Sequence, residues 1–111
     1  MSKKDLSGKI ERLEAFEEKC AIRLENISAW LNEYNRLSVL FELYPKTGTT
    51  IPNNLKIVVA VYNNNGQIVE TGYNCFHAEN FWGFEVGNCC LGKITAKDIS
   101  KIRIYPEDDR W

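Results

Sequence analysis

A change of hydrophobic periodicity at Cys20 is the feature that most constrains what this chain can fold into. Before this residue, Leu6, Ile10 and Leu13 recur at spacings of four and three, which is the period of an amphipathic helix. The same segment is rich in Glu, Lys, Leu and Ala, which lose little side-chain entropy in a helix. The pattern therefore predicts an N-terminal α-helix over residues 1–20.

After the change of period, short alternating or continuous apolar runs are separated by turn residues, which is typical of strands. With no helix between them, these runs predict a mainly β fold, an antiparallel β-sandwich of about six to seven strands over residues 21–106. An acidic tail is expected at residues 107–111. The expected strands are 21–31 with a bulge near Asn26, 36–44 ended by Pro45, 55–62 in a central position, 67–76, 81–91, and 99–105 ended by Pro106.

The strongest local signal lies at Asn63-Asn64-Asn65-Gly66, between two of the apolar runs. Asparagine and glycine adopt the positive φ angles that a tight hairpin needs. The tetrad therefore predicts an antiparallel hairpin that joins 55–62 to 67–76.

Charge and hydropathy exclude two classes of partner. The chain has 14 basic and 15 acidic residues, a net charge of −1, which leaves no broad basic surface for a nucleic acid. No apolar run approaches the roughly 20 residues of a membrane helix. Charged residues follow the N-terminal lysines where a secretory signal would be apolar, so we expect a cytoplasmic protein whose cysteines are reduced.

The one cluster with the chemistry of a metal site or a catalytic pair consists of Cys75, His77, Cys89 and Cys90. Adjacent residues of a strand point to opposite faces, so Cys89 and Cys90 cannot both join one zinc shell. A Cys75–Cys89 disulfide would force the aromatic segment around Trp82 into a turn. Free cysteine is among the most buried residue types, so we expect small buried thiols and no metal. His77 is the only histidine and lies on the same strand as Cys75, whereas a nucleophile and its base normally come from separate elements, so we expect no enzymatic activity and no cofactor.

Aromatic side chains are more numerous than one small core needs, and they supply the candidate contact surface. Core packing is favoured for Trp82 and Phe84, whereas Trp30 and Tyr73 fit a core or an interface equally well. The helical stripe of Leu6, Ile10 and Leu13 is expected to pack on the sandwich or on a second chain. These three residues, with Trp30 and Tyr73, are the candidate interface.

Four segments carry a resemblance to a known group of domains: Val39–Pro45, Val61–Asn63 with Gly66, Phe81–Phe84 and Lys101–Pro106. Over Ala21–Pro106 the chain resembles small immunoglobulin-like β-sandwich domains of uncharacterised bacterial proteins, including the group named for its Phe-x-Leu-Tyr-Asp motif. In such domains a Tyr-Asp-x-x-Gly turn closes a hairpin, and here Asn63 stands where Asp is usual. The resemblance implies an immunoglobulin-like fold and brings no catalytic residues.

These observations favour a non-enzymatic protein-interaction module that binds a protein partner or a second copy of the chain. A toxin-neutralising protein, such as an immunity protein or inhibitor, is the alternative, because a small acidic chain without an active site suits a stoichiometric blocker. A small-ligand carrier comes third and would need a well-formed apolar cavity.

The divergent directions of Cys89 and Cys90 lead to a prediction about metal content. We expect the purified protein to carry no stoichiometric zinc, and a chelator to leave its melting temperature unchanged, because structural zinc contributes folding free energy directly. Elemental analysis and thermal melts with and without chelator measure both quantities. About one zinc per chain, or a large chelator-induced loss of stability, would reverse this expectation.

Overall fold

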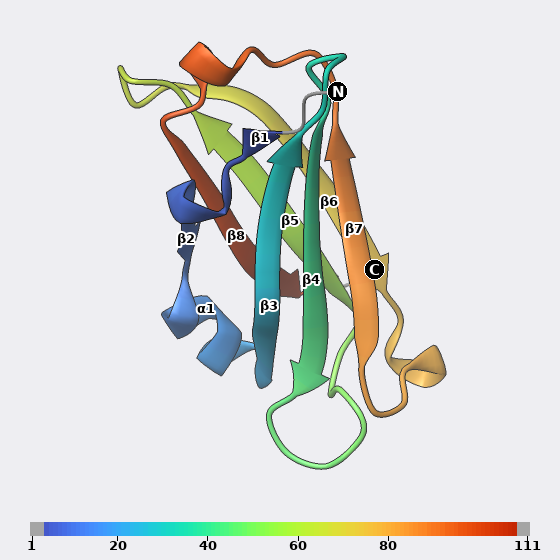
Figure 1. Cartoon of the computed structure of the whole chain (residues 1–111). Coiled ribbons are helices and arrows are strands. Elements are labelled where there is room, and N and C mark those ends of the chain that lie inside the picture. The colour runs from blue at the N-terminus through green and yellow to red at the C-terminus, as the bar shows by residue number, and fades with distance from the viewer. Residues whose placement is uncertain (1–3, 109–111) are drawn as a thin grey trace.

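The computed structural model describes residues 4–108, which form two stacked four-stranded β-sheets, three 3-10 turns and one short helix (Figure 1). The mainly β class expected from the sequence is confirmed. Among these residues, no helix has both the length and the apolar character that crossing a membrane requires. The elements are β1 (Lys4–Asp5), η1 (Ser7–Lys9), β2 (Ile10–Arg12), α1 (Glu14–Lys19), β3 (Ile22–Leu31), β4 (Leu37–Pro45), β5 (Leu55–Tyr62), β6 (Ile68–Phe76), η2 (Ala78–Asn80), β7 (Glu85–Leu91), η3 (Ala96–Asp98) and β8 (Lys101–Asp108).

Strand order defines the two sheets as β1-β3-β4-β7 and β2-β8-β5-β6. All neighbours are antiparallel except β2 and β8, which run parallel. The long strands β3 and β4 form a hairpin within one sheet, whereas the second and third strands of an immunoglobulin constant domain lie in different sheets. The strand order therefore does not confirm an immunoglobulin-like topology.

Local sequence signals place the bulge and the hairpin where they were expected. The register between β3 and β4 shifts between Glu25 and Ser28, and Asn26 adopts a positive φ of 50°, which asparagine tolerates better than most residues. In the β5–β6 turn, the Asn63 Oδ1 atom accepts hydrogen bonds from the amides of Asn65 (2.9 Å) and Gln67 (3.0 Å). The asparagine oxygen thus performs the acceptor role that an aspartate would have there.

The predicted N-terminal helix is wrong for most of its length, since only Glu14–Lys19 is α-helical and residues 1–3 lie outside the described part. The segment before α1 instead pairs β1 with the edge of β3, crosses between the sheets, and pairs β2 with the edge of β8. A short, highly charged helix is only marginally stable alone, and two open strand edges offer its backbone better partners. Leu6 is 3% exposed and belongs to the core of its own chain. The spacing of Leu6, Ile10 and Leu13 therefore belongs to an extended segment that crosses between the sheets, and not to a helix.

A buried ion pair anchors this crossing segment. Glu17 is 3% exposed, and its carboxylate accepts two hydrogen bonds from the Arg12 guanidinium, at 2.6 and 3.0 Å. The same carboxylate accepts the backbone amide of Leu24 on the edge of β3 at 3.1 Å. Three donors therefore satisfy one buried carboxylate, which is the condition under which a buried charge is tolerated.

The core lies between the sheets and is built mainly from the inward side chains of β3, β4, β5 and β8. Ile102 and Ile104 point inward with no exposed surface, as expected, and β5 is central between β8 and β6. The prediction that Pro106 ends the last strand is wrong, because β8 continues to Asp108. The amide of Leu13 bonds the Ile104 carbonyl, so Pro106, two residues on, directs its missing N–H away from β5. Glu107 and Asp108 therefore belong to β8, and the rest of the expected acidic tail lies outside the described residues.

The expectation that Trp82 and Phe84 pack in the core is also wrong. Trp82 is 75% exposed and Phe84 48% exposed, and β7 begins only at Glu85. The inward positions of β7 belong to the other parity, where Gly87 leaves room for the ring of Phe41; a Cβ at Gly87 would lie 2.1 Å from that ring. A large side chain contributed by β4 fills the space that the glycine leaves.

The ion pair between α1 and β2 leads to a stability prediction. Glu17→Ala removes the acceptor from Arg12 and from the Leu24 amide, so the free energy of unfolding should fall by about 2–4 kcal/mol. Urea denaturation measures this change. The matched control is Glu18→Ala, which removes an exposed ion pair with Lys46 and should cost less than about 0.5 kcal/mol. Equal effects of the two substitutions would contradict the anchoring role of Glu17.

Candidate functional site

An apolar diagonal crosses the outer face of the β1-β3-β4-β7 sheet. On this face Trp30 pairs with Ser38 and Val86 pairs with Glu42. Leu40 lies between Ser38 and Glu42 on the outer side of β4, so Trp30 and Val86 are its diagonal neighbours, roughly 7–8 Å away. We use the name apolar diagonal for five side chains: Trp30, Leu40, Val86, Tyr44 and Phe84.

The second half of the diagonal is an aromatic pair. Tyr44 is the next outward residue of β4 after Glu42, and its ring stacks on Phe84 with centroids 5.1 Å apart and planes 11° apart. The Arg23 guanidinium covers the Tyr44 ring at 4.6 Å. Since Val86, Phe84, Leu40 and Trp30 are between 36% and 62% exposed, the diagonal is a solvent-facing surface.

Polar groups border the diagonal on both sides. Arg23 pairs with Glu25 at 3.2 Å, and the Tyr44 hydroxyl donates to the Glu42 carboxylate at 3.0 Å, which raises the pKa of Tyr44. The remaining neighbours are small and uncharged: Ser28, Ser38, Asn88 and Cys90. An apolar centre with a polar rim is the usual composition of a protein-binding surface.

The residues predicted as one interface are not brought together. Trp30 is 37% exposed and belongs to the apolar diagonal, whereas Tyr73 is 60% exposed on the outer face of the other sheet. Leu6 is buried and Ile10 packs against the core of its own chain, whereas Leu13 is half-buried. Leu6 and Ile10 therefore pack within the chain, and of the five candidate residues Trp30 alone contributes to the diagonal.

Sequence reasoning missed the other members of the diagonal. Leu37, Val39, Phe41 and Leu43 share the inward parity of β4, so a large apolar side chain at Leu40 had to point outward. That anomaly is readable from the sequence. The stacking of Phe84 on Tyr44 depends on the pairing of β4 with β7, which periodicity does not reveal.

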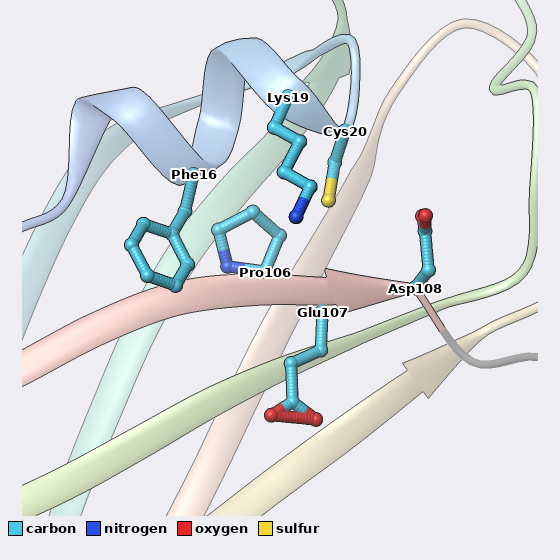
Figure 2. Close-up of a pocket in the computed structure, with 6 residues that line it drawn as sticks. All are labelled: Phe16, Lys19, Cys20, Pro106, Glu107 and Asp108. Atoms are coloured by element: carbon cyan, nitrogen blue, oxygen red, sulfur yellow. The ribbon is translucent and has the colours of Figure 1, made fainter.

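A small cavity lies between α1 and the end of β8, lined by Phe16, Lys19, Cys20, Pro106, Glu107 and Asp108 (Figure 2). Figure 2 shows the Cys20 sulfur directed toward β8 and the Glu107 carboxylate directed away from the helix. Burial and the nearby Asp108 carboxylate raise the pKa of Cys20 to about 11. The cavity volume of about 170 Å³ is below the roughly 300 Å³ at which ligand pockets begin.

A second hollow lies beside the β5–β6 turn, where Tyr62, Asn63, Asn64, Gly66, Ser100, Lys101 and Arg103 line about 290 Å³. Its strongest cation is already paired, because Arg103 Nε donates to Glu11 at 2.6 Å and the guanidinium lies 4.9 Å from the Tyr62 ring centroid. The hydrogen bond to Glu11 raises the pKa of Arg103 and lowers that of Glu11. The Glu11 carboxylate therefore already pairs with the cation that would otherwise bind an external anion.

The cysteine and histidine cluster is spread over both faces of its strands. Cys89 is buried and its neighbour Cys90 is exposed, as strand geometry predicts, while Cys75 and His77 are exposed on or beside β6. The expectation of buried thiols is therefore wrong for Cys75 and Cys90. All four cysteines are free, and within residues 4–108 no group of three or more His, Cys, Asp or Glu could hold a metal ion.

The two classes of thiol lead to a prediction about reactivity. Burial raises the pKa of Cys89 to about 11, as for Cys20, so only about one molecule in a thousand carries either thiolate at pH 8. We expect iodoacetamide at pH 8 to label Cys75 and Cys90 quickly and the other two thiols slowly. Labelling of the slow pair should accelerate as the pH rises toward 11, and site-resolved mass spectrometry measures all four rates. Four similar rates at pH 8 would contradict the described burial.

Comparison of the chain with protein-family models, with curated proteins and with solved structures gave no match in any of the three cases. The resemblance to immunoglobulin-like bacterial domains therefore stays a prediction.

Proposed function

We propose that this protein is a non-enzymatic interaction module that binds a protein partner through the apolar diagonal. The observation that carries the proposal is the group of exposed apolar side chains from Trp30 across Leu40 and Val86 to Phe84, on the outer side of the β3-β4-β7 strands. Exposed apolar patches with polar borders mark interaction sites more often than other surfaces do. A rigid sheet presents them with little ordering cost on binding.

The composition of the diagonal supports a protein partner over a small ligand. Trp and Tyr are enriched at the energetic centres of protein interfaces, and the stacked Tyr44 and Phe84 are held in place before any partner arrives. The cavity beside α1 is smaller than an ordinary ligand pocket, and the hollow beside the β5–β6 turn is lined mainly by polar residues, so neither favours a small-ligand carrier.

A binding role fits the surroundings of the two residues that could have served catalysis. His77 and Cys75 are both exposed, and neither lines either described cavity. A nucleophile and its base need a sheltered site where a substrate can meet both. A toxin-neutralising role in the cytoplasm is a special case of the proposal, and the identity of the captured partner distinguishes it from other binding roles.

The test compares capture of host proteins by the wild type and by variants of the diagonal. Trp30→Ala with Phe84→Ala should weaken capture of the specific partner at least 30-fold, since aromatic anchors contribute about 2 kcal/mol or more each. Tyr34→Ala with Phe16→Ala is the matched control, because both aromatic side chains are exposed and lie outside the diagonal and outside β6. Quantitative mass spectrometry of the captured proteins gives the measurement.

Two results would contradict the proposal. One is capture of the same proteins, in the same amounts, by the wild type and the Trp30/Phe84 variant. The other is loss of capture in the Phe16/Tyr34 control while the diagonal variant still binds. Circular dichroism and melting temperature show that each variant is folded.

A further inference from the structure

The two long sides of the sandwich are finished in different ways. On one side, the segment from β1 to α1 covers the edges of β3 and β8. On the other side, β7 and β6 are the last strands of their sheets, and no strand among residues 4–108 pairs with their outer edges (Figure 1). The open side is therefore a pair of strand edges, which are the usual places for a further strand to add.

The backbone of β6 shows which of its groups are free. The Ser100 amide bonds the Tyr62 carbonyl, which directs Tyr62 toward β8 and its neighbour Val61 toward β6. Because directions alternate along a strand, Glu70, Gly72 and Asn74 bond β5, and the N–H and C=O groups of Thr71, Tyr73 and Cys75 point outward.

One hydrogen bond supports this assignment independently. The Thr71 amide donates to the Oε1 atom of its own neighbour Glu70, at 3.2 Å. An amide inside a sheet would bond a neighbouring strand, so a side-chain acceptor marks Thr71 as an edge position.

The edge of β6 is weakly protected beyond the bulge that lies between Ile68 and Glu70. The nine residues of β6 include no Lys and no Pro, their one charge is that of Glu70, and Ile68, Val69 and Tyr73 are all exposed. The edge of β7 is less available, because the Asn88 carbonyl already accepts the Asn74 side-chain amide at 3.2 Å. The β6 edge is therefore the more receptive of the two.

We infer that β6 pairs antiparallel with β6 of a second copy of this chain, about a two-fold axis at Tyr73. The regular part of β6 after its bulge runs from Glu70 to Phe76, and Tyr73 is its middle residue. Pairing about this residue places Thr71 opposite Cys75 of the other copy at two equivalent positions and uses all three outward-facing residues. The two β2-β8-β5-β6 sheets then join into one continuous sheet.

Charge and side chains favour an identical strand as the occupant. The only charged residue of β6 is Glu70, and in this register the two copies of Glu70 lie about 20 Å apart along the strands, well beyond the screening length of about 8 Å. The two exposed Tyr73 rings become direct cross-strand neighbours, which is a favourable aromatic pair. Each ring keeps the Lys56 ammonium that lies 5.1 Å from its centroid.

Analytical ultracentrifugation of the wild type and two charge variants tests the pairing. The wild type at about 100 μM should have twice the chain mass of 12.8 kDa. Thr71→Lys with Cys75→Lys sets like charges opposite each other twice and should give a monomer, whereas Thr71→Lys with Cys75→Glu sets opposite charges there and should restore the dimer. The wild type as a monomer, or two variants in the same state, would overturn the inferred pairing.

Formation of a disulfide between the two copies tests the register of the β6–β6 pairing directly. In one chain the Cα atoms of residues 71 and 75 are about 13 Å apart, too far for a bridge, whereas directly opposed residues of a bonded pair lie about 5.5 Å apart. Thr71→Cys oxidised with glutathione disulfide should therefore form a covalent dimer on a non-reducing gel. Adding Cys75→Ser should abolish it, and a dimer that persists through Cys90 or another thiol would contradict the register. The Trp30/Phe84 variant should remain a dimer, so failure here is distinct from failure of partner binding.

Discussion

The joining of the two sheets along one side of the sandwich depends on one buried carboxylate, that of Glu17. It joins α1 to Arg12 at the end of β2 and to the backbone of β3, so one side chain connects elements that belong to both sheets. In a two-layer sandwich the sheets are held together mainly by apolar packing. This packing determines the distance between the sheets more strictly than it determines how their edge strands are positioned. The charge-assisted hydrogen bonds of Glu17 are directional, so they specify the position of the edge strands, which packing alone does not.

Much of the fold can be predicted from residue chemistry within a few positions of the chain. Alternation along 37–45 predicts the two faces of a strand, the continuous apolar run 55–62 predicts a central strand, and the Asn63–Gly66 turn predicts a hairpin, because these features depend on local geometry. The N-terminal segment could not be predicted in this way. Its apolar spacing fits a helix, but its conformation follows from the free edges of β3 and β8, which exist only after the sheets have formed. The continuation of β8 past Pro106 could not be predicted for a related reason, since only the pairing of β8 shows that no backbone N–H donor is needed at this position.

The candidate site shows the same division between local and distant information. Trp30 could be recognised as a candidate from its type, but its neighbours in the apolar diagonal come from β4, β7 and the residue before β7, and depend on register. Trp82 and Phe84 were assigned inward because large aromatics usually fill cores. The structure differs because the space in the core beside Gly87 is filled by the ring of Phe41 from the neighbouring strand. A small residue on one strand can thus be filled by a large side chain from its neighbour, which leaves nearby aromatics free to point outward.

The pairing of β2 with β8 also has a consequence for how the chain folds. Glu11 bonds Arg103, a partner 92 residues away, and Ile10 pairs with Ile102, so one of the earliest strands to be synthesised pairs with the last. Contacts this distant in sequence slow folding, because a long loop must close before they form. During synthesis the free edge of β3 gains β1 early, whereas β2 has no partner until residue 104 emerges from the ribosome. One side of the core therefore stays unsealed until β8 has been made, and a chaperone that shields exposed apolar surface has its longest opportunity there.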